Sequence, residues 1–417
     1  MTEQASTKIQ RVIGLDAHPD SFTAAVLRGR TPAQALVEKV FNKLPLSQLQ
    51  SWAAKHTTAE DLMTLEASGN SFQVVRTLAA IDRRAVVLES CQLGKLKEAH
   101  ANNDRISAVR IAKAYLAGTA KKVWVPDTKT QERRDCFHAH RKAVNQTTRA
   151  RNRLLSYLSD NGVRLKKGTR LTQNKQASEA LRQAKAWSVC QWQIIEGLLL
   201  ELEHAEQRRK HWRSLIAQEV TQDPVLLSLV RLCGIKEVIA FALGALIGNV
   251  ERFARPGSLV KYIGLNPAFD DSGQGRWSGG IGGHGRKDLR ALLIQGAQAI
   301  LRSKDPLASW GRKLTARKGS FKLAVAAVAR RLAVAIWYLL KGQWTTLEEV
   351  DRRLKNKLGT IIAGVGTERL AKIGKTREIL LEQMYQSLKR GRTYILEPNK
   401  KFVPKPKSSL AAEYGIA

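Results

Sequence analysis

Three acidic residues at the ends of predicted elements are the first candidates for chemistry. Asp16 closes the apolar run RVIGLD, Glu66 closes DLMTLE, and Asp104 stands at a predicted helix start in NNDRISAVRIAKAY. Carboxylates brought together from separate elements repel one another, and a divalent cation such as Mg²⁺ relieves that repulsion. Two such ions about 4 Å apart activate and stabilise oxygens in phosphoryl transfer. A structural role stays open for each acid alone, since Asp104 is also suited to cap a helix.

A glycine-rich stretch, GLNPAFDDSGQGRWSGGIGGHGRKDLR (residues 264–290), contains two candidate nucleophiles, Ser272 and Ser278. A serine nucleophile needs exposure, conformational freedom and nearby positive charge that stabilises the transition state. Four basic residues supply that charge and are the candidates for nucleic-acid binding: Arg276, Arg286, Lys287 and Arg290. Chemistry alone ranks neither serine above the other. A polar turn in which Ser272 hydrogen-bonds its own backbone is the alternative.

The charge of the whole chain points to a polyanionic partner. The 417 residues, enough for two or three domains, contain 70 Lys and Arg against 36 Asp and Glu, a formal net charge of +34. Such an excess favours nucleic acid as the partner. A membrane is disfavoured, because no apolar run approaches the roughly 20 residues that span a bilayer. The start of the chain, MTEQASTKIQR, also has no apolar signal-peptide region, so we expect a cytoplasmic protein.

The spacing of the cysteines argues against a structural zinc site, and the spacing of one histidine pair favours a surface location. The four cysteines are far apart and form no CxxC pair, which predicts reduced, mostly buried thiols; they are Cys91, Cys136, Cys190 and Cys233. His138 and His140 are two residues apart and do not share one face of a helix. We therefore predict that both histidines lie on the surface.

Hydrophobic patterning predicts an α/β part followed by an α-helical part. Within the first 127 residues the predicted strands are 11–16, 21–29, 61–69, 84–90 and 121–127, with helices between the later ones. This order predicts a mixed sheet covered by helices. From about 129 to 220 the chain is predicted to be helical, and its second long helix carries a short coiled-coil pattern: Ile195, Leu198, Leu202, Ala205, Trp212 and Ile216. An antiparallel hairpin within the chain and a dimer contact are equally open.

The C-terminal part is predicted to be mainly helical. Two apolar helical halves flank CGIKE (residues 233–237), which suggests a helix-hairpin-helix whose turn amides approach a DNA phosphate; a plain helical hairpin is the alternative. A further helical face follows the glycine-rich stretch, and residues 321–342 are apolar enough to be buried. The basic, proline-containing tail from about 389 is expected to be an extended or disordered arm.

The motifs IGLDAH, LEASGN and NNDRISA, followed by GLNP, DSGQGR and GHGRKDLRALL, resemble those of a known family. Over residues 10–342 the chain is similar to the DEDD transposases of insertion-sequence family one-ten, which also contains the Piv-type DNA invertases. The resemblance implies a RuvC-like (RNase H-like) N-terminal domain, coiled-coil helices and a mainly helical C-terminal transposase domain. We therefore expect a RuvC-like domain at 1–128, a basic coiled-coil region at 129–222 and a transposase domain at 223–345. A helical extension with a basic tail at 346–417 is expected to follow, and it has no counterpart in the family.

The resemblance also implies an activity. Members of this family are RNA-guided DNA recombinases of prokaryotic insertion sequences. They use a structured bridge RNA and hold double-stranded donor and target DNA in a homo-oligomer, from dimer to tetramer. The resemblance implies that Asp16, Glu66 and Asp104 bind Mg²⁺ near the scissile phosphate. It also implies a cytoplasmic protein that associates with the nucleoid. In this family the nucleophilic serine follows the GL-x-P motif after a few residues. The resemblance therefore implies that Ser272, and not Ser278, is the nucleophile that forms a covalent phosphoserine link to DNA.

The sequence departs from the family pattern at two places. The family's fourth acid falls on Ser107, which is only a weak and uncharged ligand for Mg²⁺. Gly282 and Gly283 stand where the family has a Ser-Lys step, so one lysine is absent from the predicted phosphate contact. Two alternatives stay open. One is a RuvC-like metal-dependent nuclease or resolvase in which the acids alone cleave by attack of water. The other, suggested by Ser107, is a nucleic-acid-binding protein with a decayed metal site.

Overall fold

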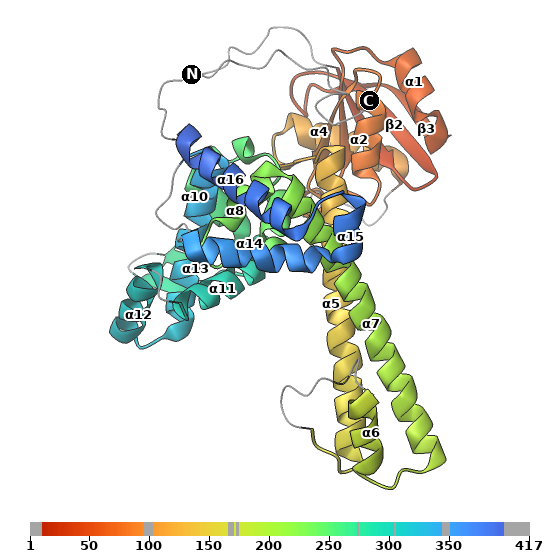
Figure 1. Ribbon diagram of the computed structural model, residues 1–417. Coiled ribbons are helices and arrows are strands. Elements are labelled where there is room, and N and C mark those ends of the chain that lie inside the picture. Colours follow the sequence, from red (N-terminus) through yellow and green to blue (C-terminus); the bar gives the residue numbers. More distant parts are fainter. Residues whose placement is uncertain are drawn as a thin grey trace. The chain divides into compact units, whose positions relative to one another are not determined.

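The computed structural model describes two units of the chain, one up to Gln131 and the other from Glu132. Its described residues are 11–95, 103–165, 171, 175–272, 275–303, 306–343 and 351–395. Figure 1 shows the sheet in the N-terminal part and helices through most of the rest. The predicted fold class, α/β followed by α, is confirmed.

A six-stranded mixed sheet forms the N-terminal unit. Its strands are β1 (Arg11–Ala17), β2 (Ser21–Arg28), β3 (Leu36–Pro45), β4 (Leu62–Glu66), β5 (Arg84–Leu88) and β6 (Lys122–Val123), in the order β3-β2-β1-β4-β5-β6. The first three are antiparallel, β4 and β5 run parallel to β1, and β6 is antiparallel to β5. The five predicted strands are confirmed. β3 was not predicted, because it is an edge strand with mostly exposed residues and no apolar run.

Helices cover the two faces of this sheet. They are α1 (Leu49–His56) with the short η1 (Leu46–Gln48) before it, α2 (Ser71–Ala79), α3 (Ser90–Lys95) and α4 (Asp104–Leu116). Because side chains alternate along a strand, Ile13 and Leu15 face the core that contains Trp52. Val12 lies on the other face, in the cluster of α4 residue Ala108. Asp16 therefore belongs to the face that α4 covers.

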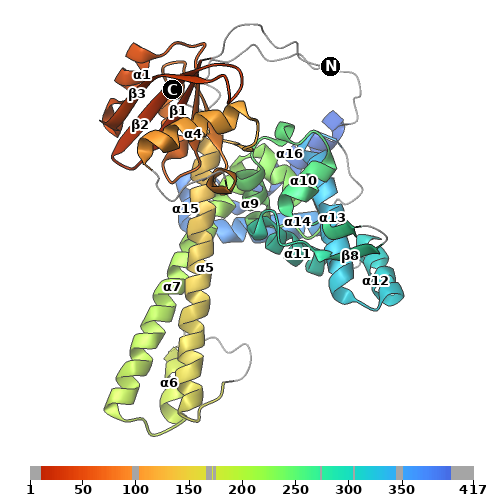
Figure 2. The same ribbon diagram turned by 180° about the vertical axis from the view of Figure 1, so that it is seen from behind.

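A long antiparallel hairpin opens the second part of the chain. α5 (Thr128–Asp160) and α7 (Val189–Gln222) lie side by side in Figures 1 and 2, with α6 (Lys175–Gln183) against them. The predicted seam residues Ile195, Leu202 and Ala205 are buried against Leu154 and its neighbours. Thr147 also donates a hydrogen bond of 3.1 Å to the Ala205 carbonyl. The intrachain hairpin is confirmed, and the dimer contact stays a prediction.

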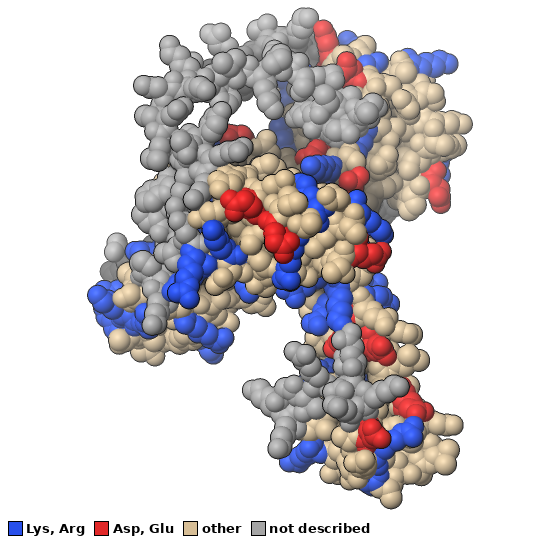
Figure 3. Space-filling view, in the orientation of Figure 1, with Lys and Arg blue, Asp and Glu red and all other residues tan. Residues whose placement is uncertain are grey.

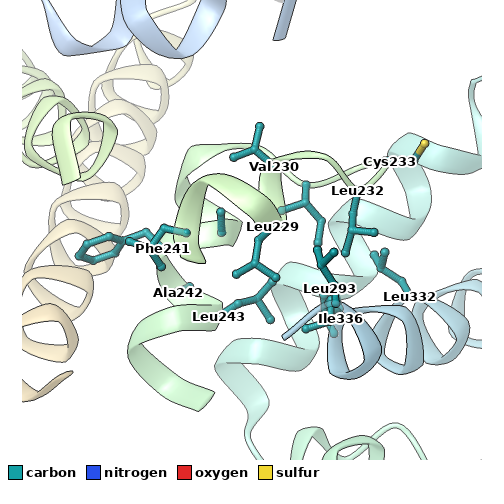
Figure 4. Packing of buried hydrophobic residues seen from close by; sticks show 14 of the residues in the cluster. Leu229, Val230, Leu232, Cys233, Phe241, Ala242, Leu243, Leu293, Leu332 and Ile336 are labelled. Carbon is teal, nitrogen blue, oxygen red and sulfur yellow. The ribbon is translucent and has the colours of Figure 1, made fainter. Parts of the chain in front are cut away.

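The remaining helices pack around one apolar core. They are α8 (Pro224–Val230), α9 (Glu237–Ile247), η2 (Val250–Arg252), α10 (Pro256–Ile263), α11 (Lys287–Leu301), α12 (Pro306–Lys318), α13 (Phe321–Leu340), α14 (Asp351–Val365), α15 (Thr367–Lys372) and α16 (Arg377–Ile395). Figure 4 shows Leu229, Leu293 and Leu332 meeting at its centre. Leu358 and Met384 join the same cluster, so the C-terminal helices are part of this core. The expected extended arm is wrong for 389–395, which are helical; the rest of the tail lies outside the described residues.

α13 corrects the prediction that no apolar run approaches the length of a membrane span. It is 20 residues long and apolar enough to meet that criterion by length and composition. Its apolar side nevertheless packs into the core, with Val328, Leu332 and Ile336 fully buried. Arg330 and Arg331 lie on its exposed side. The length and hydropathy of α13 are therefore explained by its place in a protein core.

Two predictions about surface and core positions also need correction. None of the four cysteines, all described, forms a disulfide, but Cys91 and Cys190 are exposed, so the thiols are not mostly buried. Burial raises the pKa of the Cys136 thiol to about 11. His138 is exposed as predicted, whereas His140 is buried. Position 140 follows the buried Phe137 by three residues and so shares its side of α5.

Candidate active site

Two of the predicted acids meet at the end of β1, together with a histidine. Asp16, His18 and Asp104 each offer one donor atom, and these atoms all lie within 4.8 Å of one another. His18 Nε2 is 3.5 Å from Asp104 Oδ1 and 3.9 Å from Asp16 Oδ2. Two carboxylates and an imidazole form a donor set suited to a divalent cation. His18 was not among the predicted site residues, although it stands only two residues after Asp16.

The turn that carries His18 is held by the loop after β4. The His18 backbone N–H donates to the Ser21 carbonyl at 2.8 Å and closes the turn between β1 and β2. Asn70 Nδ2 donates to the His18 carbonyl at 2.8 Å, and Ser68 Oγ donates to Asn70 Oδ1 at 2.9 Å. The stretch LEASGN therefore fixes the position of His18 as well as carrying Glu66.

A close contact between α4 and β1 brings Asp104 to Asp16. A Cβ atom on Gly14 would lie only 1.8 Å from the Ala108 carbonyl oxygen. Only glycine at position 14 therefore allows α4 to pack this closely against β1. Asn103 caps α4, because its side chain accepts a hydrogen bond of 2.9 Å from the Ile106 N–H. The alternative that Asp104 caps the helix is wrong. Its carboxylate is available to the group around Asp16.

Replacement of Gly14 by valine should therefore displace α4 and lower the free energy of unfolding by about 3 kcal/mol or more. Urea denaturation of the purified protein measures this change. Gly69→Ala is the matched control, because a Cβ at Gly69 has no neighbour within 4 Å. If Gly14→Val were as stable as Gly69→Ala, the close contact of helix and strand would be contradicted.

The surroundings of Asp16 are tuned by burial and by charge. Burial raises the pKa of Asp16 above its ordinary value, and the charge of Asp104 raises it further. His18, a hydrogen bond from the Ser107 hydroxyl and the charge of Arg110 act in the opposite direction. Arg110 Nη2 also lies 3.4 Å from Ser107 Oγ. Ser107 thus serves here as a hydrogen-bond donor to Asp16, and a bound cation would relieve the repulsion between the two carboxylates.

Glu66 lies at the same edge of the sheet on the neighbouring strand. Leu15 pairs with Leu65 in the parallel register, so the next residues, Asp16 and Glu66, face the same side of the sheet. Glu66 is half-buried at the end of β4. Among the described residues the group of donor atoms within 4.8 Å does not include Glu66. The structure thus joins two of the three predicted acids and places the third beside them.

The glycine-rich stretch is a β-hairpin of the second unit. Its strands are β7 (Pro267–Ser272) and β8 (Gly275–Ile281), which pair in antiparallel register. Ser272 pairs with Gly275 at the tip, whereas Ser278 pairs with Phe269 further along. The side chains of 268–279, including that of Arg276, lie outside the described residues. The backbone alone distinguishes the two serines by placing Ser272 at the end of its strand.

The two ends of this hairpin meet at a pair of glycines. Gly264 and Gly285 have φ values of +80° and +85°, in the left-handed region that favours glycine. A Cβ on Gly285 would lie 2.7 Å from the Gly264 Cα and N atoms. Arg290 Nη1 donates to the carbonyls of Gly264 and His284 at 3.1 and 2.7 Å. Arg290, predicted to bind nucleic acid, therefore also fastens the base of the hairpin.

Two further predicted cations stand just after the hairpin. Arg286 forms a two-pronged ion pair with Asp288, with Nε to Oδ1 at 3.0 Å and Nη2 to Oδ2 at 2.7 Å. Burial alone would raise the pKa of Asp288, but the Arg286 guanidinium outweighs it and lowers the pKa. Lys287 is exposed at the start of α11. Arg286 and Lys287 thus place positive charge beside the base of the hairpin.

Gly285→Ala should strain the base of the hairpin through its φ angle and through the contact with Gly264. We expect a loss of about 2 kcal/mol in the free energy of unfolding, since the left-handed conformation alone costs 1–2 kcal/mol. Thermal unfolding and hydrogen exchange of the hairpin amides measure the effect. Gly283→Ala, where a Cβ has no neighbour within 4 Å, should change neither. Equal behaviour of the two variants would contradict the glycine contact.

Comparison with known proteins gives a match on this second unit. Residues 228–310, from α8 to α12, match a family model described as the transposase IS116/IS110/IS902 family. The chain is 24% identical over 247 residues to the transposase for insertion sequence element IS1111A of Coxiella burnetii, covering 58% of this chain and 68% of the relative. It is 23% identical over 304 residues to y4qE of Sinorhizobium fredii, which is named a transposase, covering 66% and 74%. A Pseudomonas aeruginosa protein assigned to transposase family 20 is 28% identical over 155 residues, covering 36% and 46%.

Proposed function

Because the chain belongs to the IS116/IS110/IS902 family of transposases, which are DNA-recombining enzymes of insertion sequences, we propose that it exchanges DNA strands with a serine nucleophile under RNA guidance. One observation carries this proposal: the family match covers the β7–β8 hairpin and its clamped base. In that segment Ser272 ends strand β7, and the base of the hairpin is closed by the contact of Gly264 and Gly285 with cations beside it.

We assign the N-terminal unit to the RuvC-like (RNase H-like) class. Support comes from its strand order, with three antiparallel strands followed by two that run parallel to β1. For the segment around CGIKE we propose a helix-hairpin-helix. The two helices α8 and α9 flank a turn whose Gly234 has a φ of +74°, in support of this assignment. A nucleic-acid phosphate is the ligand that such a turn suits.

The residues at the end of β1 fit a divalent cation, and we propose Mg²⁺. Asp16 and Asp104 would hold the ion, with Glu66 at the same edge and His18 as a further donor. Carboxylate oxygens suit Mg²⁺, and the imidazole makes Mn²⁺ a natural substitute. When bound, the cation would neutralise charge on a phosphate that reacts there. Asn70 and Gly14 act indirectly, because they fix the positions of His18 and α4.

The proposed covalent step is an attack on a DNA phosphodiester. Ser272 Oγ loses its proton and forms a bond to phosphorus, while one P–O bond of the DNA backbone breaks. The released DNA hydroxyl takes up a proton, and the strand end stays on the protein as a phosphoserine ester. Attack by another strand's hydroxyl reverses the step and regenerates the serine. Positive charge near the attacked phosphate would offset the charge that develops on the phosphoryl oxygens. Arg276, which pairs with Asp271 next to the tip of the hairpin, is the candidate for this role, whereas Arg286 and Lys287 stand at the base and suit phosphates further along the strand.

Guide RNA and double-stranded donor and target DNA are the proposed partners. A formal net charge of +34 supports an extended contact with polyanions. We further propose that the chain works as a homo-oligomer, from dimer to tetramer. The α5–α7 hairpin supports this, since it exposes apolar side chains such as Val189 and Leu200.

The proposal is tested by mixing the protein with Mg²⁺, donor and target DNA, and RNA transcribed from the flanks of its gene. Recombined DNA and a protein–DNA adduct on denaturing gels are expected, both dependent on the RNA. Nicked DNA without an adduct would indicate the RuvC-like nuclease or resolvase instead. Salt-sensitive binding to RNA and DNA without Mg²⁺-dependent cleavage would indicate a nucleic-acid-binding protein with a decayed metal site.

A further inference from the structure

A groove of about 770 Å³ lies between the base of the β7–β8 hairpin and helices α12 and α13. Figure 2 shows β8, α12 and α13 at this place. The groove is lined by Leu265, Pro267, Gly280, Ile281, Trp310, Lys322, Leu323, Ala326, Ala327, Arg330, Arg331 and Val334. This volume falls within the range of pockets that bind small ligands or parts of larger ones.

The lining combines an apolar floor with a cationic rim. Leu265, Leu323 and Val334 supply apolar surface, and Leu323 is 46% exposed. Lys322, Arg330 and Arg331 supply the charge, and no acidic residue belongs to the described lining. The sequence itself contains no acidic residue between Asp305 and Glu348. Figure 3 shows further lysine and arginine side chains around α12 on the face that it draws. An anionic ligand with an apolar part is complementary to the lining of the groove.

A planar platform stands in the wall of this groove. The Arg331 guanidinium lies over the Trp310 ring, 3.7 Å from its centroid. Guanidinium planes and indole rings are the groups on which unpaired nucleobases stack, and stacking of this kind tolerates any base. Because a base in a duplex presents only its edges to a protein, a platform of this shape suits a base that has left the stack.

We propose that this groove receives an unstacked base of the DNA strand whose phosphate Ser272 attacks, an inference that rests on the proposed function. The base stacks against the platform of Arg331 and Trp310, above the apolar floor, and Lys322 and Arg330 contact the flanking phosphates. DNA is favoured over RNA because Pro267, Gly280 and Ile281 of the groove belong to the hairpin that carries Ser272.

The spacing along β7 agrees with a position near the attacked phosphate. Five residue steps separate Pro267 from Ser272, which span roughly 16 Å at about 3.3 Å per residue of strand. One strand of B-DNA advances about 3.4 Å per nucleotide, so that distance corresponds to about five stacked nucleotides and to fewer in an unstacked strand. The groove would therefore hold a base within a few nucleotides of the attacked position.

The test uses the full-length Ser272→Ala protein, so that binding is measured without cleavage. Fluorescence anisotropy at fixed salt compares a fully paired DNA with the same DNA carrying two unpaired thymines. We expect about tenfold tighter binding of the unpaired DNA, the effect of stacking one base. Leu323→Gln should remove this preference. Phe321→Gln is the matched control: it lies on the same helix, is 47% exposed and does not line the groove.

Photocrosslinking with 5-iodouracil at the unpaired positions locates the base, and we expect the crosslink on the peptide that contains Trp310. Thermal unfolding confirms that both glutamine variants remain folded. The proposal would be overturned by equal affinity for the paired and the unpaired DNA, or by a crosslink outside the groove. It would also be overturned if unpaired bases tightened the binding of RNA but not that of DNA. A Leu323→Gln protein that changes its oligomeric mass but keeps the preference for unpaired DNA would also overturn the proposal, because the groove would then be filled by a second copy of the chain. The adduct assay with Ser272 intact is independent of these readouts and reports on the proposed function alone.

Discussion

Ser272→Ala is expected to abolish the covalent protein–DNA adduct and to lower strand exchange by at least about 10⁴-fold, since loss of a serine nucleophile elsewhere costs up to about 10⁶. The hydroxyl oxygen forms the bond to phosphorus, and alanine offers no atom that replaces it. Ser272 stands at the tip of the hairpin, beside the two-residue connection to Gly275. Denaturing gels and a strand-exchange assay with labelled DNA measure both effects.

Ser278→Ala is the matched control for this experiment. Ser278 lies in the opposite strand of the same hairpin, paired with Phe269. Its replacement should leave strand exchange within about twofold, as is usual for substitutions away from reacting groups. DNA binding of Ser272→Ala should match that of the unsubstituted protein. An adduct that persists in Ser272→Ala and disappears in Ser278→Ala would reverse the assignment of the nucleophile.

Asp16→Asn is expected to have the second largest effect, a loss of strand exchange of at least about 10³-fold together with the loss of metal binding, since a catalytic ion contributes several kcal/mol of charge stabilisation. The amide keeps the size of the side chain but removes the charge that a cation requires. Mg²⁺ or Mn²⁺ should therefore raise the thermal midpoint of the unsubstituted protein and not that of the variant. Thermal unfolding with and without each ion provides a readout independent of activity.

The same variant should be at least as stable as the unsubstituted protein when metal is absent. Burial raises the pKa of Asp16, so the ionised carboxylate is disfavoured in the folded state. Between the ordinary pKa of 3.8 and the raised value the folded protein binds more protons than the unfolded chain. The contribution of Asp16 to stability is therefore greatest at low pH and is lost as the pH rises through this window.

Asp20→Asn serves as the control for Asp16→Asn. Asp20 is exposed in the same turn, and it does not belong to the group of Asp16, His18 and Asp104. It should leave metal binding, activity and metal-free stability unchanged. A metal-induced rise in the thermal midpoint that survives Asp16→Asn but not Asp20→Asn would place the cation elsewhere.

The sequence was sufficient for features that depend on local pattern. Apolar runs predicted five of the six strands of the N-terminal sheet but neither β7 nor β8 of the hairpin, and alternating apolar steps predicted the seam of α7. The third strand, β3, escaped because an edge strand exposes most of its side chains and has no apolar run. The apolar composition of residues 321–342 also predicted a buried helix, and the packing of α13 confirms it, although its length and hydropathy alone would equally fit a membrane span.

Contacts between distant residues could not be predicted in the same way. Gly14 and Ala108 are far apart in sequence, yet their contact determines how closely α4 packs against β1 and therefore where Asp104 lies. His18 joins the acids because Asn70, from another loop, holds its carbonyl. Arg290 was predicted to bind nucleic acid because it stands near the candidate serines in the sequence, whereas its hydrogen bonds to Gly264 and His284 depend on how the hairpin closes. These features become visible only once the chain is folded.

The closure of the β7–β8 hairpin has a consequence for how such proteins diversify. The chain leaves the helical core at Gly264 and returns to it at Gly285, two points that touch. Lengthening the segment between touching points costs little, because loop entropy grows only with the logarithm of length. Relatives, or engineered variants, are thus able to carry segments of different length at this position. The helices that carry it need no redesign.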